Sequence, residues 1–86
     1  MCTYLTETVG VSGSGKGAAG WFKLSEATVY FDHPVHASAE HTLNIDFRDP
    51  ALGPSGRVAV ELTAESARAL AEAITSTLAS APPGLT

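Results

Sequence analysis

Alternation of apolar and polar side chains predicts four β-strands in this chain. Residues 3–11 are rich in the β-branched and aromatic side chains that strands favour, and three later segments alternate along their length: 21–33, 41–48 and 57–62. Within residues 21–33 the apolar positions change phase at Ser25 and Glu26, which indicates a β-bulge. The intervening segments are rich in glycine, histidine or proline, so we expect them to connect the strands.

After the fourth predicted strand the pattern becomes that of an amphipathic helix, from Ala64 to about Ala79. Thr63 is a favourable N-cap, and Pro82, Pro83 and Gly84 end the helix. Five residues form its apolar stripe: Ala67, Leu70, Ala71, Ile74 and Leu78. The sequence therefore predicts one domain, residues 1–86, of the α+β class. It would be a four-stranded, mostly antiparallel sheet with one C-terminal helix packed on one face.

The two strands on either side of the histidine-containing segment are expected to form a hairpin. In the simplest register position 33 lies opposite 41, 31 opposite 43 and 29 opposite 45, so that His33 and His41 meet at the end of an apolar face. The other face is polar, which usually means that it is solvated, although it could also be a binding surface. Its residues would be Thr28, Tyr30, Asp32, Thr42, Asn44, Asp46 and Arg48.

All three histidines of the chain fall within nine residues, 33–41, together with Glu40 and directly after Asp32. Imidazole is the commonest protein ligand for transition metals. We therefore predict a site for one divalent transition metal, formed by His33, His36 and His41. Zinc, iron or nickel would suit such ligands, and the sequence does not select one. The alternative is that the histidines fill a polar loop and form hydrogen bonds with the carboxylates.

Cys2 is the only cysteine, so no intramolecular disulfide can form. It could ligate the metal beside the histidines, or it could be an ordinary structural thiol. Three protein ligands and an open position would make the site catalytic, whereas four protein ligands would make it structural. In the catalytic case the metal would hold Cys2 as a nucleophilic thiolate, and Glu40 or Asp32 would act as general acid or base.

The glycine-rich segment 10–17 partly matches the phosphate-binding motif G-x-x-x-x-G-K-[ST]. Gly17 stands where the motif needs a hydroxyl group for magnesium, and an extended pattern follows instead of a helix. We therefore expect Gly13 to Gly17 to form a connection between strands that binds no nucleotide tightly.

Composition and charge narrow the range of partners. The net charge is −4 with only five Lys and Arg residues, which disfavours nucleic-acid binding. The chain has no apolar stretch near 20 residues and its N-terminus is polar, so we expect neither a membrane span nor a signal peptide, and a cytoplasmic location. Residues 3–11 have only Glu7 as a charge against edge-to-edge pairing, so a homo-oligomer is expected if this strand is outermost.

Three segments, 1–7 (MCTYLTE), 30–37 (YFDHPVHA) and 40–47 (EHTLNIDF), resemble a family of short actinobacterial proteins of unknown function. Some of its members are similar to small metalloproteins that take part in the biosynthesis of sulfur-containing nucleosides. The resemblance implies a metalloenzyme of secondary metabolism that acts on a small-molecule substrate, for example by incorporating sulfur. The alternative is a non-catalytic module that is stabilised by metal and forms oligomers or binds a partner.

Overall fold

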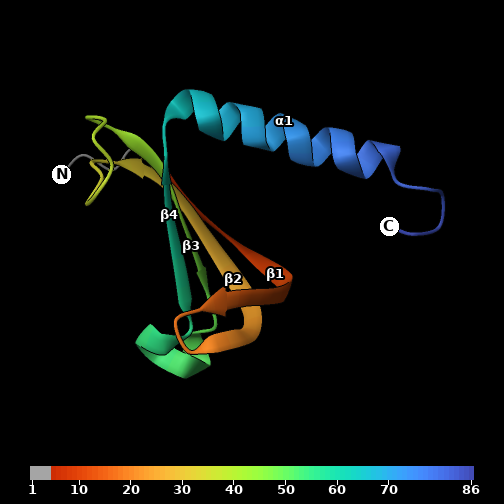
Figure 1. The fold of residues 1–86 in the computed structure, drawn as a ribbon, viewed down its shortest axis with the longest axis horizontal. Helices are drawn as coiled ribbons and strands as arrows, with labels where there is room; N and C mark the ends of the chain where they lie inside the picture. Colours follow the sequence, from red (N-terminus) through yellow and green to blue (C-terminus); the bar gives the residue numbers. More distant parts are fainter. Residues whose placement is uncertain (1–4) are drawn as a thin grey trace.

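The computed structural model describes residues 5–86. These residues form four antiparallel strands followed by a C-terminal helix (Figure 1). The strands follow one another across the sheet in chain order, and this arrangement confirms the predicted fold. The elements are β1 (Thr6–Gly17), β2 (Gly20–Asp32), β3 (Thr42–Arg48), the short 3₁₀ helix η1 (Pro50–Ser55), β4 (Arg57–Leu62) and α1 (Ala64–Ser80).

The connection predicted at Gly13 to Gly17 is wrong, because these residues continue β1 and pair with the start of β2. The turn lies at Ala18 and Ala19, and Gly20 completes it with a φ of +116°. A Cβ atom on Gly15 would lie only 3.1 Å from the Leu24 side chain. The glycines thus make room for large side chains of the neighbouring strand and remain within the sheet.

The predicted bulge is confirmed, although the additional residue belongs to β1. Gly10 pairs with Glu26 and Gly13 pairs with Leu24, so two residues of β1 lie opposite Ser25. β1 is an outer strand of the sheet, which is the condition under which the sequence predicts a homo-oligomer.

The register predicted for the central hairpin is confirmed, with Val29 opposite Ile45 and Phe31 opposite Leu43. This register gives the sheet one apolar face and one polar face. On the polar side Tyr30, Asn44 and Glu61 lie in one row across β2, β3 and β4.

The helix begins as predicted, because the Thr63 side chain accepts a hydrogen bond from the backbone N–H of Ser66 at 3.1 Å. It contacts β3 and β4 and then projects beyond the sheet (Figure 1). Its apolar stripe is therefore only partly covered: Leu70 is 44% exposed, Ile74 53% and Leu78 59%. In the described part of the chain no helix has the length and apolar character that crossing a bilayer requires.

Candidate functional site

The histidine-containing segment 33–41 is attached to β4 by a carboxylate. Glu61 accepts hydrogen bonds from three successive backbone N–H groups, those of Val35, His36 (3.0 Å) and Ala37 (2.9 Å). These bonds, led by those from Val35 and Ala37, lower the pKa of Glu61 below its ordinary value. The contact folds the loop over the polar face of the sheet and thereby creates a pocket.

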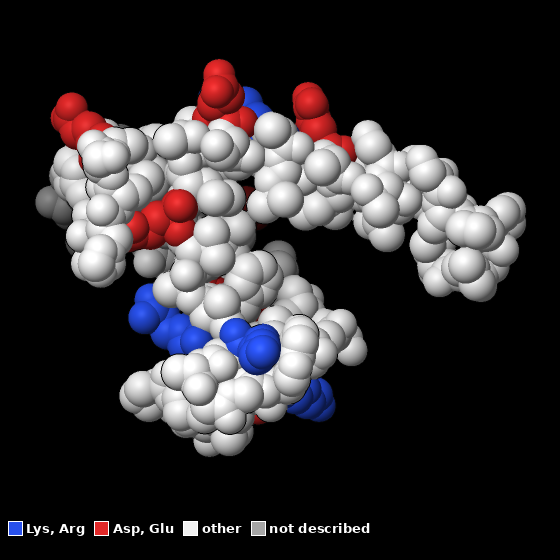
Figure 2. Space-filling view, viewed as in Figure 1, with Lys and Arg blue, Asp and Glu red and all other residues white. Residues whose placement is uncertain are grey.

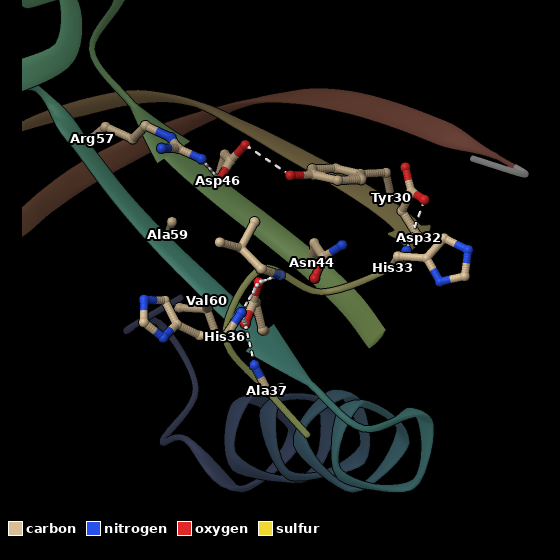
Figure 3. A pocket seen from close by; sticks show the side chains of 12 residues that line it. Tyr30, Asp32, His33, His36, Ala37, Asn44, Asp46, Arg57, Ala59 and Val60 are labelled. Atoms are coloured by element: carbon tan, nitrogen blue, oxygen red, sulfur yellow. Dashed lines mark hydrogen bonds and ion pairs between the residues drawn. The ribbon is translucent and has the colours of Figure 1, made fainter. Parts of the chain in front are cut away.

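This polar-face pocket lies between the loop and strands β2, β3 and β4 (Figure 3). Its floor is the polar sheet face, and Val35 and Ala37 of the loop form part of its wall. The polar side chains that line it are Tyr30, Asp32, His33, His36, Asn44, Asp46, Arg57 and Glu61.

A connected row of side chains crosses the floor from β4 to β2 (Figure 3). Arg57 forms an ion pair with Asp46, with 2.8 Å between Nη2 and Oδ1, and the Tyr30 hydroxyl donates to the other carboxylate oxygen at 3.3 Å. Burial and the negative charge of Asp46 raise the pKa of Tyr30. The phenol therefore keeps its proton at neutral pH, and its oxygen can still accept a hydrogen bond from a ligand.

Asn44 lies at the centre of the floor and is only 4% exposed. Its Oδ1 accepts a 2.7 Å hydrogen bond from the hydroxyl of Thr42, which is fully buried. Within residues 5–86 its Nδ2 donates no hydrogen bond. Every fully buried side-chain nitrogen or oxygen in this part of the chain has a hydrogen-bond partner, so Nδ2 is not fully buried. The amide nitrogen of Asn44 is thus accessible from the pocket and available as a donor. The sequence favours a solvated polar face, but on that face Thr42 and Asn44 are buried.

The lining carries more negative than positive charge. Asp32, Asp46 and Glu61 contribute three carboxylates, against the single guanidinium of Arg57. Asp32 also accepts a 2.7 Å hydrogen bond from the backbone N–H of His33, which holds this carboxylate at the end of β2. Such a site favours a neutral or cationic ligand over an anionic one.

His33 and His41 come together as the register predicts, with ring centroids 4.4 Å apart and planes inclined by 32°. The Nδ1 atom of His33 lies 2.9 Å from the carbonyl oxygen of Glu40, which can only accept, so Nδ1 carries the proton. His41 also stacks on Phe31, with 5.6 Å between the centroids.

The structure does not bring His36 to this pair. His36 belongs to the part of the loop that Glu61 holds, and Figure 3 shows it at the opposite end of the pocket from His33. Among residues 5–86 no group of three His, Cys, Asp or Glu side chains is arranged to hold a metal ion. Cys2, the further predicted ligand, lies outside the described residues.

Two features of the pocket are absent from the sequence-based prediction: the anchoring role of Glu61 and the central position of Asn44. A signal for both exists in the alternating pattern, because each is a polar residue on the polar face of the sheet. Nothing in the pattern indicates that the loop would cover them.

The chain belongs to DUF6295, a family of unknown function, which matches residues 1–86. No curated protein and no solved structure shows significant similarity to it.

Proposed function

We propose that this member of DUF6295 binds a small polar molecule in the polar-face pocket. The ligand would be neutral or cationic and would carry hydroxyl or amino groups. The observation that supports this function best is Asn44, a nearly buried side chain whose amide nitrogen is available to the pocket.

The Asn44 amide nitrogen is not fully buried, so it can bond to water until a ligand takes its place, and a matched hydrogen bond then contributes about 0.5–1.5 kcal/mol. The buried Thr42 hydroxyl already occupies the Asn44 oxygen and fixes the orientation of the amide. A ligand that accepts a hydrogen bond from Nδ2 would satisfy the remaining donor. A few oriented polar groups of this kind commonly determine ligand specificity.

The surrounding groups are complementary to donors on the same ligand. The Tyr30 oxygen can accept a hydrogen bond, and the carboxylate of Asp32 lies on the pocket wall. Asp32 is also the predicted general acid or base that lies in this pocket. We therefore propose that the protein could also act as an enzyme on the bound molecule. Asp32 would then be the first candidate for proton transfer.

Amide NMR of ¹⁵N-labelled protein tests this function. Titration with sets of sugars, nucleosides and small amines should identify a class that shifts the side-chain NH₂ signals of Asn44. Replacing Asn44 by Leu removes the Nδ2 donor to the ligand, together with the acceptor of the Thr42 hydroxyl, and should weaken binding of that class at least roughly five- to tenfold.

Thr8→Ala is the matched control, since Thr8 lies on the same sheet face on β1, where its hydroxyl is 3.1 Å from that of Thr28. It should leave the affinity unchanged. The pocket is not the binding site if the ligands found leave the Asn44 side-chain signals unshifted. The same conclusion follows if they bind the Asn44→Leu variant as tightly as the wild type.

A second candidate function is metal binding at the His33–His41 pair. Histidines that ligate metals usually donate their other ring N–H to a carbonyl or carboxylate group, as the Nδ1 atom of His33 does toward Glu40. Two imidazoles do not complete a tetrahedral zinc site, so Cys2 is proposed as a third ligand. A metal there would lower the pKa of a bound water or thiol. The predicted sulfur chemistry, with Cys2 as nucleophile and Glu40 or Asp32 as acid or base, belongs to this candidate.

Elemental analysis of untagged protein tests the metal site, because a tag could block the N-terminus beside Cys2. One zinc, iron or nickel ion per chain is expected. His33→Ala and His41→Ala should each weaken metal binding about tenfold or more. His36→Ala is the control and should retain the metal. Substoichiometric metal, with no rise in melting temperature when these ions are added, would contradict this candidate.

A further inference from the structure

An apolar groove separates α1 from the sheet, on the face opposite the polar-face pocket. The side chains that line it come from the sheet and from the helix stripe: Val29, Leu43, Ile45, Leu62, Leu70 and Ile74. Among residues 5–86, Arg68 is the only charged residue that lines this groove. Figure 2 shows the projecting helix with its charged side chains on the outer side, away from the sheet. The surface turned toward the groove is therefore apolar.

The described chain exposes more surface than a folded monomer of its size. Its accessible surface is 6250 Å², whereas a monomer of 8.8 kDa is expected to have about 4,800 Å². The radius of gyration is 14.3 Å, against about 12 Å for a compact chain of this length. The excess of about 1,450 Å² shows that this elongated chain leaves more surface uncovered than a compact monomer does.

We propose that a second copy of this chain covers the groove and forms a symmetric homodimer. In this dimer the C-terminal half of each α1, with Ile74 and Leu78, lies on the open apolar face of the other sheet. That face extends over β1 and β2, where Val9 and Val29 lie on the same side as the groove. Val9 is 51% exposed in the single chain.

Three observations select a second copy as the occupant. First, if two copies covered this excess on each other they would bury about 2,900 Å² together, which falls in the range of obligate homodimers, about 2,000–5,000 Å². Second, the projecting apolar ridge and the open apolar face belong to the same surface, as a two-fold symmetric interface requires. Third, the charged side chains of α1 lie outside the groove apart from Arg68, and on the receiving face of β1 Glu7 lies opposite Val29, so the charges near the interface are of opposite sign.

The oligomeric state of the full chain, measured by light scattering at about 10, 50 and 200 µM, gives the first test. A mass twice that of the chain is expected, and Ile74→Asp should shift it to the monomer mass. Ser76→Asp is the matched control, because two helical positions correspond to about 200° around the axis. This control should remain dimeric. A wild-type monomer throughout this range, or an Ile74→Asp dimer, would overturn the proposal.

A second measurement decides the question even if Ile74→Asp fails to fold. In a mixed sample of labelled and unlabelled wild-type chains, isotope-filtered NMR detects contacts between copies only. The proposal expects contacts from the methyl groups of Ile74 and Leu78 to those of Val9 and Val29. Contacts that join only the outer β1 strands of two copies would show edge pairing and overturn the proposed interface. Neither test depends on the polar-face pocket, which lies on the other face of the sheet.

Discussion

At the residue scale, one carboxylate determines where the histidine loop lies. Glu61 accepts three backbone N–H groups that are 24 to 26 residues away in sequence. The alternating pattern predicts the meeting of His33 and His41, because both continue paired strands. It does not predict the position of His36 or the burial of Asn44, because both depend on this long-range contact. The proposed pocket was therefore not predictable in detail.

The lowered pKa of Glu61 predicts that the loop detaches in acid. A group whose pKa is lower in the folded state stabilises that state above its unfolded pKa, here near 4.5. This stabilisation is lost as the pH falls through the lower, folded value. The backbone amide signals of Val35, His36 and Ala37 should therefore shift together as the pH decreases below about 4.5.

Glu61→Gln removes the charge and should make these three amide signals independent of pH in the same range. Glu72→Gln on α1 is the control, and it should leave the acid transition of the loop intact. A loop transition of the same size in Glu61→Gln would show that another group controls the loop.

At the element scale, the local pattern predicts most of the fold. The strand alternation gives the pairing of β2 with β3, and the Thr63 cap gives the start of α1. The end of β1 was mispredicted because glycine is usually read as a connection signal. In this hairpin Gly15 and Gly17 instead accommodate the side chains of Leu24 and Phe22, each 3.1 Å from the position of an added Cβ. Such cross-strand filling depends on the register, which the local sequence does not give.

The apolar stripe of α1 was predicted, but not how much of it the sheet would cover. The helix has 17 residues and is therefore about 25 Å long, whereas four strands span about 15 Å from the first to the last. Figure 1 shows the C-terminal half projecting past the sheet. Helical periodicity identifies an apolar stripe but does not tell whether the same chain or another copy covers it.

At the scale of the whole molecule, the single chain has a small core. Among the described residues Ala27 is the only hydrophobic residue that is buried, at 4% exposure. A chain of about 80 residues gains little stability from a single core and often relies on oligomerisation. The helix stripe leaves Leu70, Ile74 and Leu78 exposed beside the groove, so covering them would add apolar burial that the single chain lacks. We therefore expect folding and dimer formation to be coupled.

Coupling of this kind makes the melting temperature depend on protein concentration, because dilution favours the unfolded monomers. A hundredfold increase in concentration contributes about 2.7 kcal/mol, which should raise the melting temperature by roughly 5–10 °C for a dimer of this size. Circular dichroism and scanning calorimetry between low and high micromolar concentrations would measure the change. Ser76→Asp should show the same dependence. A melting temperature of the wild-type chain that is constant over this range would mean that the sheet and helix are stable without a second copy.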